Sequence, residues 1–238
     1  EGIRGQCFFQ KHGMSGMPAA LHTVAIEGEA QEYLYVEDIE GVLALVQMNA
    51  IEIHPWGSTL ADIEHPDHIV FDLDPGPGVA WKRMLDAART LRARLRGVGL
   101  EGFVRSTGGK GLHVVVPLNP RPDWASAKAF AQAMARTLAA ESPDAFVATA
   151  AKNKRRGRIF VDYLRNARGA TAVASYCVRA RAGAGVATPL RWDELSRLRS
   201  ASQYDINNIP RRLAGMKRDP WHGCDGLKQA LPKKIREN

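Results

Sequence analysis

The segment His68–Gly78, HIVFDLDPGPG, limits what this chain can fold into, because a strand-forming run ends abruptly in two aspartates and a turn. Ile, Val and Phe favour strands, whereas the prolines and glycines that follow cannot continue one. Side chains alternate along a strand, so we expect Asp72 and Asp74 on one face, about 6 to 7 Å apart, and Leu73 on the other. Such a pair can bind a divalent cation, although aspartates before a turn also bond the turn backbone, and both interpretations stay open here.

Length and composition set the class of protein. With 238 residues and 45% hydrophobic content, the chain is one large domain or two small ones with a packed core. No apolar run approaches the roughly 18 to 20 residues of a membrane span, and no leader opens the chain, so we expect a cytoplasmic protein. Three scattered cysteines without a Cys-x-x-Cys pair indicate neither disulfides nor a zinc knuckle. The start at Glu1 suggests a piece of a longer protein.

Basic residues are concentrated in one window. The net charge is +8, and residues 152–181 hold nine Lys and Arg but only one acid, Asp162. Such a local field suits a polyphosphate or a nucleic-acid backbone, while a solvated loop is the plainer alternative. The candidates for DNA contacts are Lys152, Lys154, Arg155 and Arg156.

Periodicity predicts a mixture of helices and strands. Apolar residues recur at helical spacing in 81–96, and Asp38 and Asp123 are N-cap candidates for helices over 39–48 and 124–140. Shorter helical pieces are expected at 192–198 and 210–216. Strand patterns cover 6–10, 33–36, 50–53, 103–106, 112–117, 146–149, 158–163 and 171–178. The predicted class is α/β (α+β).

The glycine-rich loop between two predicted strands is a candidate phosphate site. It reads STGGKGLH from Ser106 to His113, and it is not a Walker A motif, because Lys110 precedes Gly111 and a strand. Small residues nevertheless let backbone N–H groups converge on an anion, and Ser106, Thr107 and Lys110 add donors and charge. His113 is either a site residue or a satisfied core histidine.

A third carboxylate repeats the pattern of the first two. Asp162 ends the run RIFVD inside the basic window, where a carboxylate is expected to face a cation or an arginine. With Asp72, Asp74 and the glycine loop, it completes the set of groups that two-metal nucleotidyl transfer requires. Phe8 or Phe9 could stack on a base or pack in the core, and His54 suits a site or an ordinary loop.

Taken in order, the segments GQCFFQKH, HPWGS, HIVFDLDPGPG, TGGKGLHVVVPL, RIFVDYLRN and DINNIPRRL resemble the polymerase domain of bacterial ATP-dependent DNA ligase D, a member of the archaeo-eukaryotic primase superfamily. The resemblance covers residues 1–238 as one primase-like domain whose N-terminal part, which recognises a 5′-phosphate, is missing. It implies two packed α/β modules with mixed sheets around a catalytic cleft.

The resemblance also implies residue roles and partners. Asp72, Asp74 and Asp162 correspond to ligands of two Mn²⁺ or Mg²⁺ ions. The residues expected around the nucleotide are His54, Ser106, Thr107, Lys110, His113, Arg165, Arg179, Arg181 and Phe8 or Phe9. The expected partners are DNA ends or primer-template, (ribo)nucleoside triphosphates, the end-binding protein Ku, and covalently linked ligase and phosphoesterase domains.

The implied function is extension of a DNA 3′-hydroxyl during bacterial non-homologous end joining, at the nucleoid in the cytoplasm. Two alternatives stay open, namely a noncatalytic nucleic-acid-binding module and a metal-dependent nuclease. Incubation of labelled primer-template with metal and nucleotides separates the three, because it yields lengthening, no change or shortening.

Overall fold

The structure is a computed structural model that describes residues 8–232. The chain divides into two compact units between Ile53 and His54, and each is described by itself. Within the described residues, no helix has the length and apolar character needed to cross a bilayer.

The first unit contains a small antiparallel hairpin and one helix. Strand β1 (His22–Val24) pairs with β2 (Tyr33–Tyr35), and helix α1 (Ile39–Gln47) follows. The predicted cap of this helix is confirmed, because Asp38 Oδ1 accepts a hydrogen bond from Gly41 N at 3.0 Å. The strand predicted over 6–10 is not formed in the part that the structure describes, and Gln6 and Cys7 lie outside the described residues.

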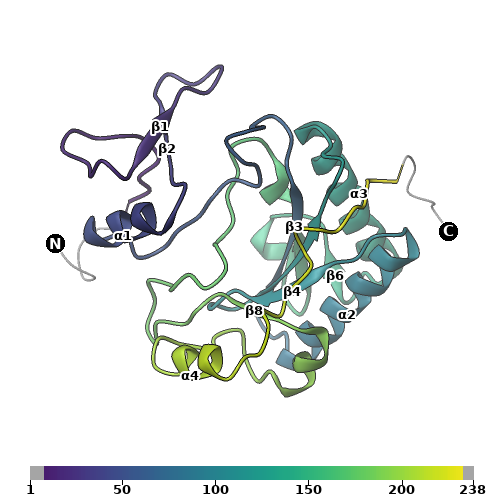
Figure 1. Ribbon diagram of the computed structural model, residues 1–238. Coiled ribbons are helices and arrows are strands. Elements are labelled where there is room, and N and C mark those ends of the chain that lie inside the picture. The colour runs from purple at the N-terminus through teal and green to yellow at the C-terminus, as the bar shows by residue number, and fades with distance from the viewer. Residues whose placement is uncertain (1–7, 233–238) are drawn as a thin grey trace. The chain divides into compact units, whose positions relative to one another are not determined.

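The second unit is built on a mixed six-stranded sheet (Figure 1). Its strands lie in the order β6-β7-β3-β5-β4-β8, and all neighbours are antiparallel except β6 and β7. The bounds are β3 His68–Pro75, β4 Phe103–Ser106, β5 Leu112–Pro117, β6 Phe146–Val147, β7 Ile159–Asp162 and β8 Thr188–Leu190. The mixed α/β class is therefore confirmed, and β3 lies inside the sheet with a partner on each side.

Two long helices cover one face of this sheet (Figure 1). They are α2 (Trp81–Gly97) and α3 (Trp124–Glu141), the latter capped by Asp123, whose Oδ1 accepts from Ser126 N at 2.6 Å. Alternate residues of β3 and β5, such as Phe71, Leu73 and Val114, join the apolar faces of both helices in one buried core. Because side chains alternate along a strand, the remaining residues of β3 and β5 point to the opposite face.

Some predicted elements are absent and some observed ones were not predicted. Residues 171–178 do not form a strand, because Tyr176 has a φ of 62° and the backbone bonds to loops, with Ala172 N donating to Pro55 O. Residues 50–53 are also irregular, whereas β1 and β8 had no clear strand pattern. The tail contains the predicted helical pieces as the 3₁₀ helix η3 (Trp192–Arg197) and α4 (Ile209–Ala214).

The turn after β3 requires a glycine. Gly76 N donates to Arg158 O at 2.9 Å, so the basic segment passes directly against the end of β3. A methyl group placed on Gly76 would lie 1.8 Å from the carbonyl oxygen of Arg155. This contact fixes where Arg155 lies relative to β3.

We therefore expect Gly76→Ala to destabilise the second unit by about 1 to 3 kcal/mol, the usual cost of forcing an extra methyl group into a packed site. Urea unfolding followed by tryptophan fluorescence measures it. The control is Gly97→Ala at the end of α2, where an added methyl group meets nothing within 4 Å and alanine favours the helix. Equal midpoints for the two variants would show that the segment moves aside freely.

Candidate active site

Four polar residues lie in register across the four inner strands of the sheet. Asp72 on β3 is directly opposite Asp162 on β7 on one side and His113 on β5 on the other. His113 is in turn opposite Arg105 on β4. Residues directly opposite one another on antiparallel strands point to the same face, with Cβ atoms roughly 4.5 to 5.5 Å apart. Asp162, Asp72, His113 and Arg105 therefore form one line, called the polar row below.

The polar row lies on the face of the sheet that the two long helices leave uncovered. Leu73 is fully buried in the helix-covered core, whereas Asp72 and Asp74 on either side of it are partly exposed. The prediction that the two aspartates share a face is thus confirmed. The other members of the row are nearly buried, with exposed fractions of 8% for Asp162, 3% for His113 and 6% for Arg105.

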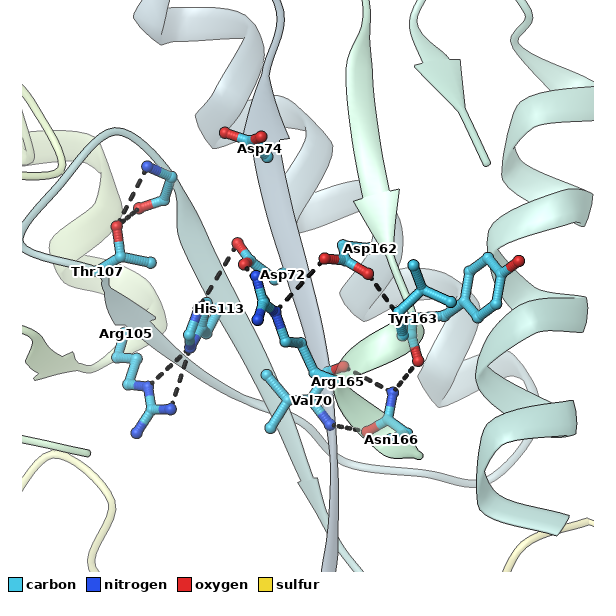
Figure 2. Close-up of polar contacts among 12 residues, drawn as sticks. Val70, Asp72, Asp74, Arg105, Thr107, His113, Asp162, Tyr163, Arg165 and Asn166 are labelled. Carbon is cyan, nitrogen blue, oxygen red and sulfur yellow. Dashed lines mark hydrogen bonds and ion pairs between the residues drawn. The ribbon is translucent and has the colours of Figure 1, made fainter. Parts of the chain in front are cut away.

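Arg165 bridges the two carboxylates of the row (Figure 2). Its Nε lies 3.7 Å from Asp72 Oδ2 and 3.4 Å from Asp162 Oδ2. The other oxygen of Asp162 accepts a hydrogen bond from Leu164 N at 2.8 Å. The guanidinium cation of Arg165 therefore lies between two carboxylate oxygens. Carboxylate oxygens are also the ligands that Mg²⁺ and Mn²⁺ prefer. The two carboxylates thus offer the kind of ligand atom that a divalent ion requires.

Buried Asn166 holds Arg165 in this place. Asn166 belongs to the 3₁₀ helix η2 (Leu164–Asn166) directly after β7. Its side chain accepts from Val70 N at 2.7 Å and donates to Val70 O at 2.9 Å, as a paired strand would (Figure 2). η2 is thereby fastened to β3 beside the polar row.

Asp74 does not join Asp72 and Asp162. Figure 2 shows its carboxylate apart from theirs, farther along β3, and its Oδ2 accepts from Arg155 Nη1 at 2.9 Å. Among the described residues, no three His, Cys, Asp or Glu side chains converge as metal ligands do. Two of the three predicted ligands are thus adjacent, and the third is held by an arginine.

The three carboxyl groups differ in their pKa. Burial raises the pKa of Asp72, but His113 and Arg165 lower it by more, so the net shift is downward. Burial raises the pKa of Asp74, and nearby Asp72 raises it further against the opposing effect of Arg155. Burial also raises the pKa of Asp162, although Leu164 N and Arg165 oppose it. Asp72 is the carboxylate that stays ionised most readily.

Arg105 is a site residue that sequence reasoning missed. Its Nε and Nη2 lie 3.1 and 3.0 Å from His113 Nδ1, while His113 Nε2 lies 3.5 Å from Asp72 Oδ1 (Figure 2). Burial lowers the pKa of Arg105 to about 10, and Asp72 opposes this, so the guanidinium stays charged at neutral pH. Counting outward from the glycine loop in the predicted hairpin would have paired Arg105 with His113.

The glycine loop is organised by Thr107. Thr107 Oγ1 accepts from Gly109 N at 3.3 Å and Gly111 N at 3.2 Å and donates to Gly111 O at 3.0 Å. Two backbone N–H groups of the loop therefore converge on this hydroxyl, and the predicted binding of an anion stays a prediction. The positive charge beside the loop comes from nearby cations.

Those cations are Lys110, Arg179 and Arg181. Lys110 is exposed, and Arg179 Nη1 donates to Thr107 O at 3.0 Å. A methyl group built on Gly109 would lie 3.5 Å from Arg181 Nη1, which places that guanidinium beside the loop. The fold thus brings Arg179 and Arg181, from a distant part of the sequence, to the loop that contains Lys110. These three residues are the predicted phosphate-binding cations.

Ser106 does not line the site. It is fully buried, its Oγ has no hydrogen-bond partner, and alternation along β4 directs it away from the face of Arg105. Its predicted contact with a nucleotide is not available in this geometry. His54 is half-buried at the start of the second unit, and exposed Phe8 and Phe9 belong to the first unit, so their roles stay predictions.

The basic segment divides into exposed and internal cations. Lys152 and Lys154 on the 3₁₀ helix η1 (Lys152–Lys154) are exposed, as is Arg156. Arg155 is partly buried instead. Its guanidinium donates hydrogen bonds to Asp74 and, at 2.8 Å, to Ala150 O, and it lies 4.0 Å from the centre of the Phe160 ring. Arg155 thus serves as a counterion inside the site, which corrects its assignment to the exposed DNA-binding group.

The raised pKa of Asp162 predicts a pH-dependent cost to stability. The folded chain binds a proton on Asp162 more readily than the unfolded chain does, because the pKa of this carboxyl group is near the ordinary 3.8 when the chain is unfolded. The ionised carboxylate therefore destabilises the fold above the folded-state pKa, and this cost disappears below 3.8. In metal-free buffer, Asp162→Asn should raise the urea midpoint at pH 7, with a gain that shrinks toward pH 4.

Asp86→Asn on α2 is the matched control, since Asp86 is exposed and its ion pair with Arg89 lies on the surface. Its midpoint should follow that of the intact protein at both pH values. A gain for Asp162→Asn that is equal at pH 7 and pH 4 would contradict the stated cause.

Comparison with known proteins identifies the family. A model of the protein family described as LigD, primase-polymerase domain, matches residues 1–221. The multifunctional non-homologous end joining protein LigD of Pseudomonas aeruginosa is 41% identical over 239 aligned residues, which cover 99% of this chain and 28% of that protein. The bifunctional LigD of Bacillus subtilis is 27% identical, over 89% of this chain and 34% of its own length.

A solved structure with a similar fold indicates the same family as these sequence relatives. It is the polymerase domain of Mycobacterium tuberculosis ligase D in complex with DNA, with a TM-score of 0.84 and 29% sequence identity. The match covers 97% of this chain and 82% of that one. This chain spans only about a third or less of the full-length relatives, so it corresponds to one domain of theirs. The chain belongs to the LigD primase-polymerase domain family.

Proposed function

We propose that this chain is a DNA repair nucleotidyltransferase, which adds nucleotides to a 3′-hydroxyl at DNA ends or gaps during bacterial non-homologous end joining. The observation that carries the proposal is the polar row beside the glycine loop, in a chain of the LigD primase-polymerase family. Two adjacent carboxylates supply oxygen ligands, and a cluster of cations lies one loop away. Nucleotidyl transfer needs both groups close together.

The cations around the loop suit the incoming triphosphate. Up to three positive charges lie near Gly109, from Lys110, Arg179 and Arg181, and the Thr107 hydroxyl bonds the loop to itself. Arginine binds phosphate oxygens with two parallel hydrogen bonds, which orients the triphosphate as well as holding it. His113 lies between this loop and Asp72. Its ring can donate a hydrogen bond either to the Asp72 carboxylate or to the triphosphate.

Asp72 and Asp162, together with Asp74, would hold the two Mn²⁺ or Mg²⁺ ions. Such ions, when bound, activate the attacking hydroxyl and stabilise the leaving pyrophosphate. Arg165 and Arg155 offset part of the charge of the three carboxylates in the present arrangement. Because Arg165 is 44% exposed, it can turn from the carboxylates toward a triphosphate at low cost.

The exposed cations suit the backbone of DNA, and the structure of the related Mycobacterium tuberculosis polymerase domain is a complex with DNA. Lys152, Lys154 and Arg156 are free of the internal role that holds Arg155. The further partners that the proposal includes are Ku and linked ligase and phosphoesterase domains. Since bacterial chromosomes lie in the cytoplasm, the protein would act there.

Extension of a labelled primer-template tests the reaction. We expect Asp72→Asn and Asp162→Asn each to lower the extension rate about a hundredfold or more, because each removes an anionic ligand worth several kcal/mol to the transition state. DNA binding, measured by fluorescence anisotropy, should persist. Asp86→Asn is the matched control and should extend normally, since Asp86 lies on α2, away from the row.

The same incubation separates the alternatives. Lengthening supports the transferase, shortening would indicate a nuclease, and binding without any product would indicate a noncatalytic module. Near-normal extension by either aspartate variant would remove that residue from the catalytic set.

The DNA-binding surface has its own test. Replacing Lys152, Lys154 and Arg156 together by Ala should weaken DNA binding similarly for all sequences. The slope of log K against log salt concentration should also become less negative by up to about 2 to 3. The reason is that roughly 0.7 to 0.9 counterion is released for each of the three phosphate contacts.

Removal of three charges from α2, at Lys82, Arg89 and Arg94, controls for net charge. If that variant changed the salt dependence equally, the effect would be one of overall charge and not of this surface.

A further inference from the structure

Arg105 occupies a place that no assigned role explains. It lies at the end of the polar row, 6% exposed, with two guanidinium nitrogens on His113 Nδ1 at 3.1 and 3.0 Å. Nη1 donates to Ser175 Oγ at 3.2 Å, and the guanidinium carbon lies 5.7 Å from the centre of the Trp221 ring. Trp221 is itself fixed, because its Nε1 donates to Val104 O at 3.0 Å. Arg105 is thus held from three sides, with two of its donors directed at one nitrogen.

The chemistry of these groups fixes the proton on His113. A guanidinium carries N–H donors and no acceptor. Two donors directed at Nδ1 therefore require a lone pair there, which excludes both the tautomer protonated on Nδ1 and the doubly protonated ring. The single ring proton must then be on Nε2, the nitrogen that lies 3.5 Å from Asp72 Oδ1.

We propose that Arg105 is a positioning residue, which holds His113 as the neutral tautomer with its Nε2–H directed into the active site. His113 is then a fixed hydrogen-bond donor to anions. It cannot serve as a general base toward the 3′-hydroxyl, because the nitrogen facing the site has no lone pair. The row acts as a chain in which Arg105 orients His113, and His113 in turn donates toward Asp72.

The consequence for nucleotide binding rests on the proposed function. An incoming triphosphate beside the glycine loop brings oxygen acceptors near His113, and a neutral donor binds them without adding charge to the row. With the opposite tautomer, a lone pair would face the phosphate oxygens and repel them. Loss of Arg105 should therefore weaken nucleotide binding more than it slows the chemical step.

The tautomer is tested directly by nitrogen-15 NMR of histidine-labelled protein, without metal or nucleotide. The His113 resonances are assigned by their loss in His113→Gln. We expect Nδ1 of His113 to show the shift of an unprotonated ring nitrogen and Nε2 that of a protonated one. In Arg105→Met this pattern should change toward a mixture of tautomers, and Arg105→Lys, which keeps a donor, should restore part of it.

Kinetics give a second readout. We expect Arg105→Met to raise the Michaelis constant for nucleotide about tenfold, the effect of one lost hydrogen bond to a charged group, with a smaller change in kcat. In a His113→Ala background the same change should have little further effect, because Arg105 acts through His113. A merely structural role would instead add its effect in both backgrounds.

Arg92→Met is the matched control. Arg92 is a half-buried arginine that, like Arg105, lies against an indole, with its guanidinium carbon 4.5 Å from the centre of the Trp192 ring, but it is on α2. It should affect stability without changing the His113 spectrum or the Michaelis constant.

Two results would overturn the proposal. One is a proton on Nδ1 of His113 in the intact protein, which the first spectrum decides even if Arg105→Met does not fold. The other is an unchanged His113 spectrum in Arg105→Lys and in folded Arg105→Met. A protein that extends no DNA but shows the predicted spectra would contradict the proposed function and leave the role of Arg105 standing.

Discussion

The register between neighbouring strands is the constraint on which the rest of the site depends. Asp72 pairs with Asp162 and with His113 because β3 lies between β7 and β5 in one antiparallel arrangement. A shift of one residue in either pairing would direct the partner side chain to the helix-covered face. The apolar residues between them prevent this shift, since Leu73, Val161 and Leu112 would then lose their place in the core.

Placing two carboxylates side by side on a half-buried face is unfavourable, and the structure compensates with arginines. Arg165 lies between Asp72 and Asp162, Arg155 binds Asp74, and Arg105 is at the far end of the row. Opposite charges within a few ångströms favour the ionised carboxylate, while burial opposes it. Arginine side chains therefore compensate part of the charge that the sheet gathers on this face.

The segments that carry these arginines are fastened by backbone contacts. Asn166 bonds both backbone groups of Val70 and so fixes the 3₁₀ helix of Arg165. Gly76 permits the close passage of residues 155–158. The fold therefore sets where the backbone presents Arg165 and Arg155 beside β3.

The sequence by itself determined the local elements and the face of each side chain on them. Alternation in HIVFDLDP placed Asp72 and Asp74 together opposite Leu73, and the capping aspartates Asp38 and Asp123 marked the helix starts. These features depend on neighbouring residues alone, so periodicity reveals them. The resemblance of the ordered motifs to a polymerase domain added Arg165, Arg179 and Arg181 to the nucleotide candidates.

Only the tertiary structure decided how those candidates meet. It set Asp72 against Asp162 and gave Arg155 to Asp74 instead of leaving it to solvent. It also turned the Thr107 hydroxyl into the acceptor of its own loop and placed Arg105 on His113. The physical reason is that pairing between strands far apart in the sequence, and the choice among several possible hydrogen-bond partners, depend on the packing of the whole sheet and not on local spacing.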